Sequence, residues 1–540
     1  MPPGLHLFAP RHRGKTKMNQ KIIGISIGFI SGLFVVIAST VSAYEASRGP
    51  TELIYWDPYK AYSGYTMVKP QRVQGVYLID MAGQAVNHWP AFSDAYLQED
   101  GTVFGAIGNR TFAIQDWDGN TLWEYPEQRE GYNPHHDFLR VYNAELDDYT
   151  ILYIANAPLT HDEVIELGAN PDAAERYDDA QMDTIVEVDS NGTIVWEWRF
   201  RDHLIQDIDS SKANYVGRGN SIADYPERLD INWGVVSPDY LHANGLDYNP
   251  NTGHIAISSN RTHEIFIIDH DGTFVAGDPE ESHSLAAGED GDFLYRFGNP
   301  ANYGQGEYPH YAKKNWSLME YSGHKQIGGN HDIQWIKEGL PGAGNLLLFN
   351  NGLTVPRGQG DSDPQSEFIE LNPYLDANGV ERDHYVNPPE AGYTDVMPGT
   401  DSEQGPLATR LFSKQILSTY HTTDGFNSHH GSAVQRMPNG NTLVQLARVG
   451  RMVEVTPDGE VVWEYVNPFT WSGEVVKTLI TSNPDHQNTF NGWSPFRWMP
   501  DYPGLAGKDL SPMGPITDIH DDSSVPNAAE SPVRPIEENY

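Results

Sequence analysis

One phrase recurs along this chain of 540 residues. It consists of an apolar run ending near an acidic residue, a turn with glycine, and a second run that often carries tryptophan. A typical copy has the run 185–189, the turn Asn191-Gly192 and the run 195–198. Such turns between alternating runs indicate β-hairpins, because both turn positions need positive φ. Further copies start near residues 76, 112, 265, 452 and, more weakly, 368, so the sequence predicts six hairpins.

A second pair of apolar runs accompanies these hairpins, as at 346–349 and 442–445. Two hairpins per repeat make four strands, which is the blade of a β-propeller. The prediction is an all-β, six-bladed β-propeller over about residues 72–500, with five or seven blades as alternatives. A set of β-sandwiches is the competing fold, but unrelated sandwiches would not repeat one phrase so often.

Histidines lie where the innermost strand of several blades is expected to begin. These positions are His136, His242, His331 and the pair His429-His430. Arginines follow the second strand of a blade at Arg110, Arg261, Arg357 and Arg448. If the repeats surround an axis, these side chains meet at one mouth of the central channel. Imidazole can attack an electrophile or exchange a proton near neutral pH, and arginine fits tetrahedral oxyanions. The set therefore predicts a site for an anionic substrate or a histidine nucleophile.

A metal centre is the first competing interpretation of this site. The chain lacks the His-x-x-x-His and His-Glu-x-x-His spacings, and Arg357 would repel a cation. Neighbouring histidines such as His135-His136 would point to opposite faces of an extended strand, so each pair would offer one ligand. We therefore expect no catalytic metal and no cofactor, while a structural calcium ion stays open.

The bulk composition excludes several classes of partner and chemistry. The formal net charge is -39, from 35 basic and 74 acidic residues, so the sequence predicts no nucleic-acid partner. The chain has 0 cysteines. Disulfides, thiolate zinc sites and cysteine nucleophiles are thereby excluded.

The N-terminus has the pattern of a secretory signal. A basic stretch at 11–17 precedes an apolar run at 22–41, which ends in Val41-Ser42-Ala43. We expect a signal peptide at 1–43, with Met18 as an alternative start and an uncleaved membrane anchor at 22–41 as an alternative fate. Either outcome places the protein in the periplasm or makes it secreted. The oligomeric state is left open, with a homodimer as one alternative.

The predicted organisation has four parts. The signal segment 1–43 is followed by an N-terminal extension at 44–71, the propeller at 72–510, and an acidic, Pro-rich tail at 511–540.

Several phrases, in order, resemble the bacterial arylsulfotransferase family. They are 242–250, 257–261, 330–333, Asn350-Asn351-Gly352 with Arg357, 436–443 and 500–505. The likeness extends over about residues 70–500. It implies a six-bladed propeller that moves a sulfuryl group from a phenolic sulfate ester to a phenol without a nucleotide donor. A sulfohistidine would be the intermediate.

The resemblance also implies residue roles. His242 and His331 match the two supporting histidines of the family, and Arg357 matches the arginine that holds the charged group. The nucleophile is expected at His430, with His429 and then His421 as alternatives. Substrate binding is expected of the remaining candidates, His136, Asn244, Arg261, His421 and Arg448.

The chain departs from the family in two respects. Studied members carry an N-terminal β-sandwich domain, whereas about 30 residues separate Ala43 from the first predicted blade. The family's disulfide is missing too. Two rival functions follow, namely a histidine-dependent, sulfatase-like hydrolase and a non-catalytic propeller that binds a ligand or a protein.

Overall fold

The structure is a computed structural model that describes most of residues 51–520. The described ranges are 51–70, 73–174, 179–233, 239–306, 324–352, 366–388, 390–394, 412–420, 428, 431–469, 473, 475 and 496–520. The chain divides into two units, 1–42 and 43–540, and all described residues belong to the second. The predicted signal segment therefore lies outside the described residues. None of the helices in the described ranges has the length and apolar character that a membrane crossing needs.

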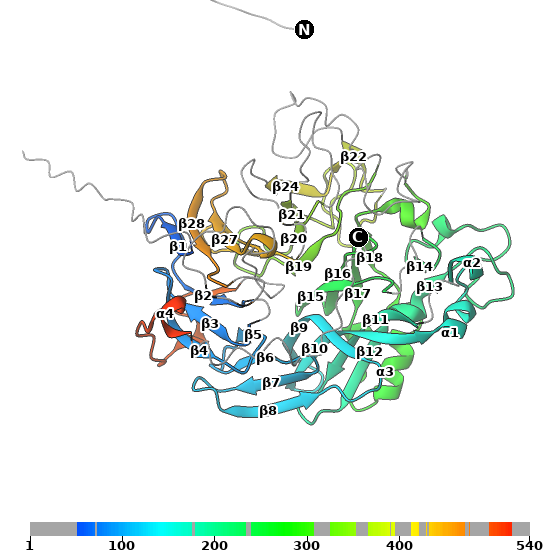
Figure 1. Ribbon diagram of the computed structural model, residues 1–540. Helices are drawn as coiled ribbons and strands as arrows, with labels where there is room; N and C mark the ends of the chain where they lie inside the picture. Colours follow the sequence, from blue (N-terminus) through cyan, green and yellow to red (C-terminus); the bar gives the residue numbers. More distant parts are fainter. Residues whose placement is uncertain are drawn as a thin grey trace, which may run out of the picture. The chain divides into compact units, whose positions relative to one another are not determined.

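Six antiparallel sheets of four or five strands surround a central axis (Figure 1). Blade 1 contains β29 (Arg497–Trp498), β2 (Tyr65–Val68), β3 (Val76–Ile79), β4 (Gln84–Trp89) and β30 (Gly514–Pro515). Blade 2 contains β5 (Asp94–Leu97), β6 (Val103–Ile107), β7 (Thr111–Gln115) and β8 (Thr121–Pro126). Blade 3 contains β9 (Asn133–Asn143), β10 (Asp148–Thr160), β11 (Asp179–Val188) and β12 (Ile194–Arg199).

The other three blades follow in chain order. Blade 4 contains β15 (Ala243–Asn249), β16 (His254–Ser259), β17 (Glu264–Asp269) and β18 (Tyr295–Phe297). Blade 5 contains β19 (His331–Trp335), β20 (Leu346–Asn350), β21 (Glu367–Leu371) and β24 (Ile416–Tyr420). Blade 6 contains β25 (Ala433–Arg436), β26 (Thr442–Leu446), β27 (Arg451–Val455), β28 (Val461–Val466) and β1 (Glu52–Trp56). The predicted all-β, six-bladed propeller is confirmed.

Smaller elements decorate the blades. Two short sheets join β13 (Leu204–Ile205) to β14 (Leu229–Asp230) and β22 (Tyr393–Thr394) to β23 (Phe412–Ser413). The described helices of α type are α1 (His161–Glu166), α2 (Pro171–Ala174), α3 (Pro279–Ala286) and α4 (Ile516–Ile519).

Both ends of the described chain close the ring. β29 pairs with β2, so a C-terminal strand supplies the inner edge of the first blade. β1 pairs with β28 and extends the outer edge of the last blade. β1 and β2 precede residue 72, where the propeller was predicted to start, and β30 follows residue 510, where it was predicted to end. Segments from both ends of the described chain thus pair with edge strands of the first and last blades, and this pairing closes the ring.

Four of the predicted hairpins form, namely β3–β4, β7–β8, β11–β12 and β27–β28. The hairpin predicted at 265–275 is wrong. After β17, Asp269 accepts a hydrogen bond from the Gly272 N–H and a 3-10 turn forms at 271–273. Asp278 then caps α3, with Pro279 in its first turn, and the outer strand β18 comes only afterwards. The weaker copy at 368–373 also lacks an adjacent partner, since β21 pairs with the distant β24.

The repeated phrase has two structural roles. Its acidic residue caps the turn: Asp116 Oδ1 accepts from the N–H groups of Asp118 and Asn120, while Gly119 takes φ +84°. Its tryptophan joins neighbouring blades, because the indole N–H donates to the turn that follows the third strand of the next blade. The pairs are Trp89 with Asp116 O, Trp123 with Ser190 O, Trp196 with Thr273 Oγ1 and Trp463 with Met81 O.

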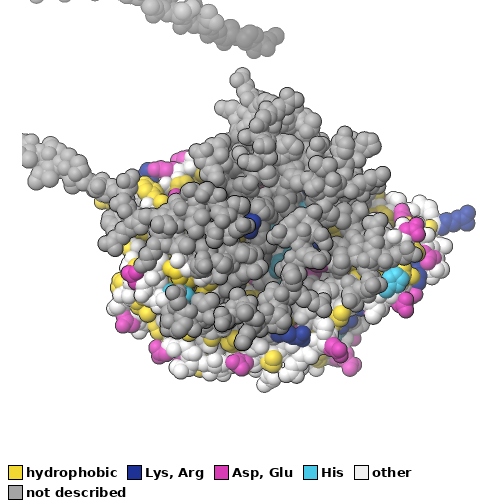
Figure 2. Space-filling view, viewed as in Figure 1, with side chains coloured by type: hydrophobic (Ala, Val, Ile, Leu, Met, Phe, Trp, Pro, Cys, Tyr) yellow, Lys and Arg dark blue, Asp and Glu magenta, His cyan; other side chains and the backbone are white. Residues whose placement is uncertain are grey.

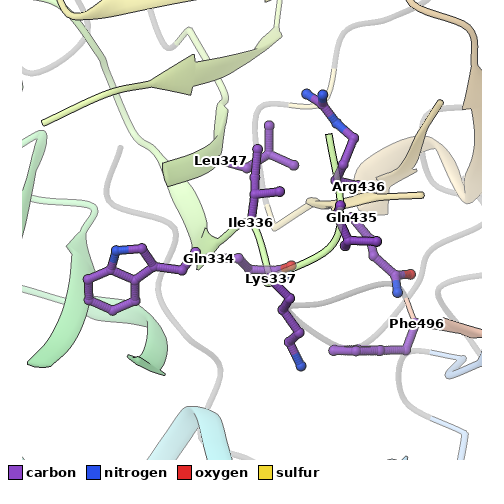
Figure 3. A pocket seen from close by; sticks show the side chains of 9 residues that line it. Gln334, Ile336, Lys337, Leu347, Gln435, Arg436 and Phe496 are labelled. Atoms are coloured by element: carbon purple, nitrogen blue, oxygen red, sulfur yellow. The ribbon is translucent and has the colours of Figure 1, made fainter. Parts of the chain in front are cut away.

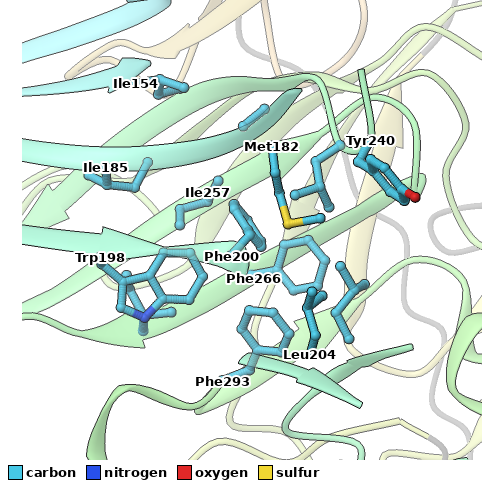
Figure 4. Close-up of a cluster of buried hydrophobic side chains, with 14 of the residues drawn as sticks. Ile154, Met182, Ile185, Trp198, Phe200, Leu204, Tyr240, Ile257, Phe266 and Phe293 are labelled. Carbon is cyan, nitrogen blue, oxygen red and sulfur yellow. The ribbon is translucent and has the colours of Figure 1, made fainter. Parts of the chain in front are cut away.

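Apolar side chains fill the spaces between adjacent blades. Between blades 3 and 4, Ile154, Met182 and Trp198 pack with Ile257 and Phe266, all fully or almost fully buried (Figure 4). Burial of such side chains stabilises the fold by about 1.5–3 kcal/mol each. Acidic side chains are spread over the described parts of the face in Figure 2 and do not gather in one patch.

Buried carboxylates join the innermost strands around the axis. Asp137 on β9 accepts the Leu246 N–H of β15 at 2.9 Å. Asp247 on β15 accepts the Trp335 N–H of β19 at 2.8 Å. Asp332 on β19 accepts the Val434 N–H of β25 at 2.8 Å, and each bond thus fixes one blade to the next.

Removing one of these carboxylates should destabilise the propeller. Asp332 is fully buried, and Asp332→Ala would leave the buried Val434 N–H without this acceptor. We expect the free energy of unfolding to fall by about 1–3 kcal/mol in urea titration. The matched control Asp458→Ala, at an exposed turn position, should stay within about 0.5 kcal/mol of wild type. Equal stability of the two variants would contradict the role of this bond.

Asp137 should make stability depend on pH. Burial raises the pKa of Asp137 to about 7, against about 3.9 in an unfolded chain. Between these values the folded state holds a proton that the unfolded state has lost, so the free energy of unfolding falls as pH rises. In urea titrations from about pH 5 to about pH 8, wild type should lose more stability than Asp137→Asn. Parallel curves would show that Asp137 does not titrate in this window.

Candidate functional site

The predicted histidines stand at the starts of neighbouring innermost strands, where the backbone is strained. Positive φ values occur at His136 (62°) and Asp332 (53°), which lie among the first residues of β9 and β19. They also occur at His242 (51°) and Ser432 (85°), which directly precede β15 and β25. Residues other than glycine rarely adopt this conformation, and it concentrates at functional sites. The same mouth of the channel is thus strained in four successive blades.

Two imidazoles and a carboxylate form a linear relay in blades 3 and 4. The Nε2 atoms of His136 and His242 are 2.9 Å apart. His242 Nδ1 lies 2.5 Å from Asp239 Oδ2, so Nδ1 is the protonated nitrogen that donates to the carboxylate. The side chain of His242 is 29% exposed, which leaves it within reach of a ligand. One proton can therefore be shared between His136 and His242 next to a fixed negative charge.

His135 adds a third imidazole to this cluster. Its ring centroid lies 4.8 Å from that of His136 and 6.1 Å from that of His242. The expectation that His135 and His136 point to opposite faces is wrong, because the positive φ of His136 takes the backbone out of the extended conformation. His135 Nε2 lies 2.8 Å from Asp183 Oδ1, and Asp183 Oδ2 accepts the Ala243 N–H.

Each of the two carboxylates is paired with an imidazole, and each pairing shifts a pKa. Although burial opposes ionisation, His242 and then His135 lower the pKa of Asp239 to about 2. Although burial favours a neutral ring, Asp183 raises the pKa of His135. Asp239 is hence ionised at neutral pH and can stabilise a protonated His242.

His331 is held by an amide that also reaches blade 6. Asn351 Nδ2 donates to the carbonyl oxygens of Ser428 (2.6 Å) and Gly431 (2.8 Å). Its Oδ1 therefore faces His331 Nδ1, at 2.7 Å, and His331 must donate from Nδ1. Ser428 and Gly431 flank the pair His429-His430 in the sequence. One side chain thus links His331 to Ser428 and to Gly431.

A neutral histidine braces the turn that carries His331. Burial, together with Lys325 and Arg261, places the pKa of His263 well below its usual value. The neutral Nδ1 accepts the Gly329 N–H at 2.8 Å, while Gly329 O lies 3.0 Å from His331 Nδ1.

The remaining predicted residues have different positions. Asn244 is buried and joins blades 4 and 5, since its Nδ2 donates to Asn330 O at 2.9 Å. Arg261 is half-buried and acts electrostatically on Asp239. Arg448 is half-buried, and its backbone N–H donates to Ser428 Oγ at 3.0 Å. The other predicted residues, Arg357, His421, His429 and His430, lie outside the described residues.

The sequence prediction missed Asp183, Asp239, Asn351 and the contribution of His135. Asp239 lies three residues before His242, a spacing that could have drawn attention to it. Asp183 comes from β11, and only the folded sheet brings it to His135. Within the described ranges, no group of three or more His, Asp or Glu side chains is arranged to hold a metal ion. The assembled chemistry is that of a proton donor and acceptor next to polar anchors.

Comparison with known proteins gives one family. Residues 99–372, just over half of the chain, match the family model described as Arylsulfotransferase (ASST). No curated protein matches.

Solved structures show only distant likeness. A protein of unknown function from Bacteroides caccae is 11% identical, with 75% of this chain and 94% of that chain covered at a TM-score of 0.37. A protein from Lactobacillus plantarum is 9% identical, with 81% and 99% covered at a TM-score of 0.35. A putative 6-phosphogluconolactonase from Bacteroides fragilis is 9% identical, with 82% and 100% covered at a TM-score of 0.35.

Proposed function

Because the chain belongs to the arylsulfotransferase family and is therefore an aryl sulfotransferase, we propose how its channel mouth performs the transfer. The proposed donor is a phenolic sulfate ester, the acceptor is a second phenol, and a histidine carries the sulfuryl group between them. The observation that carries this proposal is the relay of Asp239, His242 and His136. We also propose that the protein acts outside the cytoplasm, which the signal pattern at 1–43 supports.

In the first half-reaction the sulfur–oxygen bond of the ester breaks and a sulfur–nitrogen bond to histidine forms. The departing phenolate needs a proton, and His242 is placed to supply one. Asp239 stabilises its protonated form, and His136 can replace the proton through the 2.9 Å contact. General acid catalysis of this kind contributes about 10²–10⁴-fold to a rate.

In the second half-reaction the acceptor phenol attacks the same sulfur atom. The sulfur–nitrogen bond breaks, the new ester bond forms, and the phenolic proton passes to the relay, which has become its base. Microscopic reversibility requires one group to serve both halves. The shared proton between His136 and His242 meets that requirement.

We propose His430 as the nucleophile, with His429 and His421 as alternatives, and Arg357 as the cation that holds the sulfuryl oxygens. The Asn351 links to Ser428 and Gly431 support this proposal, because they tether the flanks of His429-His430 to His331. We propose that His331, protonated on both ring nitrogens, donates from Nδ1 to Asn351 and from Nε2 to the sulfuryl oxygens.

The first test is a transfer assay with purified full-length protein. Nitrophenolate release from 4-nitrophenyl sulfate should depend on added phenol and should disappear in His430→Ala. Protein that is incubated with the sulfate ester alone and then denatured should carry a sulfuryl group, which mass spectrometry can locate. The control His384→Ala, at an exposed histidine paired with Asp383, should keep full activity. Continued release beyond about one nitrophenolate per protein without phenol would instead favour a hydrolase, and no release or labelling would favour a binding propeller.

If His242 protonates the leaving phenolate, the effect of Asp239→Asn on kcat/KM should depend on how basic the leaving group is. Asp239→Asn removes the negative charge that favours protonated His242, so kcat/KM for phenyl sulfate should fall by about ten- to a hundredfold. The loss should be smaller for 4-nitrophenyl sulfate, because nitrophenolate is a weak base and leaves without a proton.

The matched control for this variant is Asp383→Asn, which alters an exposed Asp–His pair of 2.9 Å. Asp383→Asn should leave kcat/KM unchanged for both phenyl sulfate and 4-nitrophenyl sulfate. Equal losses for both leaving groups in Asp239→Asn would mean that Asp239 only supports the structure.

A further inference from the structure

A second, larger space lies at the opposite ends of the same innermost strands. A cavity of about 720 Å³ is lined by the ends of β9, β15 and β19 and the residues that follow them. His242 directly precedes β15, whereas Asp247 lies near the end of this strand. Five residues of strand span about 17 Å, so the cavity is well separated from the histidines.

The lining of this cavity includes aromatic side chains, among them Trp335, whose indole N–H is buried. Trp335 is 5% exposed, and its indole Nε1 has no hydrogen-bond partner. Ile336 is 3% exposed beside it, and the walls include Val141 and Tyr248. A buried donor without an acceptor costs free energy, which a ligand acceptor would recover. The volume lies within the range of about 300–1,000 Å³ typical of small-molecule sites.

A carboxylate supplies the matching acceptor. Asp247 Oδ2 accepts the Trp335 N–H and Oδ1 accepts the Tyr248 N–H. Each carboxylate oxygen has a further lone pair, so both can still accept. Burial raises the pKa of Asp247 to about 6, although Lys337 and the Trp335 N–H oppose that rise. Near neutral pH the Asp247 carboxylate is a poorly hydrated acceptor, so a hydrogen bond from a ligand hydroxyl would stabilise it.

The charges around the cavity disfavour an anion. Arg140 is engaged by Asp100 at 2.8 Å and lies over the Tyr149 ring. Lys337 and Glu338 lie on the rim with opposite charges, and the Asp247 carboxylate lies beside the aromatic rings of the lining. Like-charge contact opposes the binding of a sulfate ester at this end.

A small side cavity of about 40 Å³ adjoins the same residues (Figure 3). It shares Ile336 and Lys337 and is also lined by Gln435, Arg436 and Phe496. Arg436 is paired with Glu370 at 2.7 Å, so its charge is not available to a ligand. Lys337 Nζ lies 5.6 Å from the Phe496 ring centroid. This space could take a small substituent.

We propose that this cavity is a second ligand site, which takes an uncharged aromatic molecule bearing a hydroxyl group. The hydroxyl donates to Asp247 and accepts from Trp335 Nε1, and the ring lies against Trp335, Ile336 and Tyr248. The site is separate from the histidine relay, and its occupancy does not require the transfer reaction. It therefore admits a phenol and excludes the corresponding aryl sulfate.

The test is a titration of purified full-length protein with 4-fluorophenol, followed by ¹⁹F NMR. It is run in a His242→Ala, His331→Ala background, so that the relay mouth contributes little. Trp335→Phe keeps an aromatic, though smaller, ring and removes the N–H, and it should weaken saturable binding by about three- to tenfold. The control Trp233→Phe also removes a buried indole N–H without a partner, on a residue 5% exposed, but outside the cavity.

Trp233→Phe should leave the affinity for 4-fluorophenol unchanged, and 4-fluorophenyl sulfate should not displace the bound phenol. Equal affinities in the two variants would overturn the proposal, as would absence of saturable binding or displacement by the sulfate. Since the titration measures binding alone, an inactive protein that still binds 4-fluorophenol would refute only the transfer mechanism. Melting curves of each variant confirm that the fold is intact.

Discussion

The bonds between inner-strand carboxylates and the backbone of the next blade are the constraint on which the rest depends. Asp137, Asp332 and the half-buried Asp247 each use a side-chain oxygen to accept an N–H group one blade further on. A sheet that packs through apolar side chains alone could slide along its neighbour, because dispersion contacts have little direction. A hydrogen bond has a preferred length and direction, so it resists such sliding. The starts of β9, β15 and β19 are therefore held at one level, and the histidines at those starts can touch.

The same bonds explain how the strained mouth is tolerated. Positive φ at His136 and His242 costs about 1–3 kcal/mol each and persists only where surrounding structure enforces it. Asp137 follows His136 directly, and the Ala243 N–H, which Asp183 accepts, follows His242 directly. Each strained histidine is thus next to an anchored residue. The strain turns the rings of His135, His136 and His242 towards one another, which an extended strand would not do.

The sequence predicted the propeller because its evidence is local. Turn glycines and capping aspartates act within a few residues, and the tryptophan that contacts the next blade recurs in the repeated phrase, as in Trp89 with Asp116. It failed where the chain makes a longer excursion, as after β17, where Asp278 and Pro279 start a helix in place of a strand. It identified the histidines but not Asp183 or Asn351, because those partners come from other strands. Side-chain direction at His136 depended on a backbone angle that composition does not reveal.

The two ends of the innermost strands carry opposite chemistry, and strand length keeps them apart. The starts hold imidazoles whose carboxylate partners favour bound protons, which suits an anionic group that must be transferred. The ends hold the Asp247 carboxylate and aromatic rings, which suit neutral molecules. In the proposed transfer an anionic ester reacts with a neutral phenol, and the two ends of the strands differ in chemistry in the same sense. Because Asp247 and the residues at the starts belong to the same rigid strands, the separation of about 17 Å is fixed by the backbone rise and not by any loop.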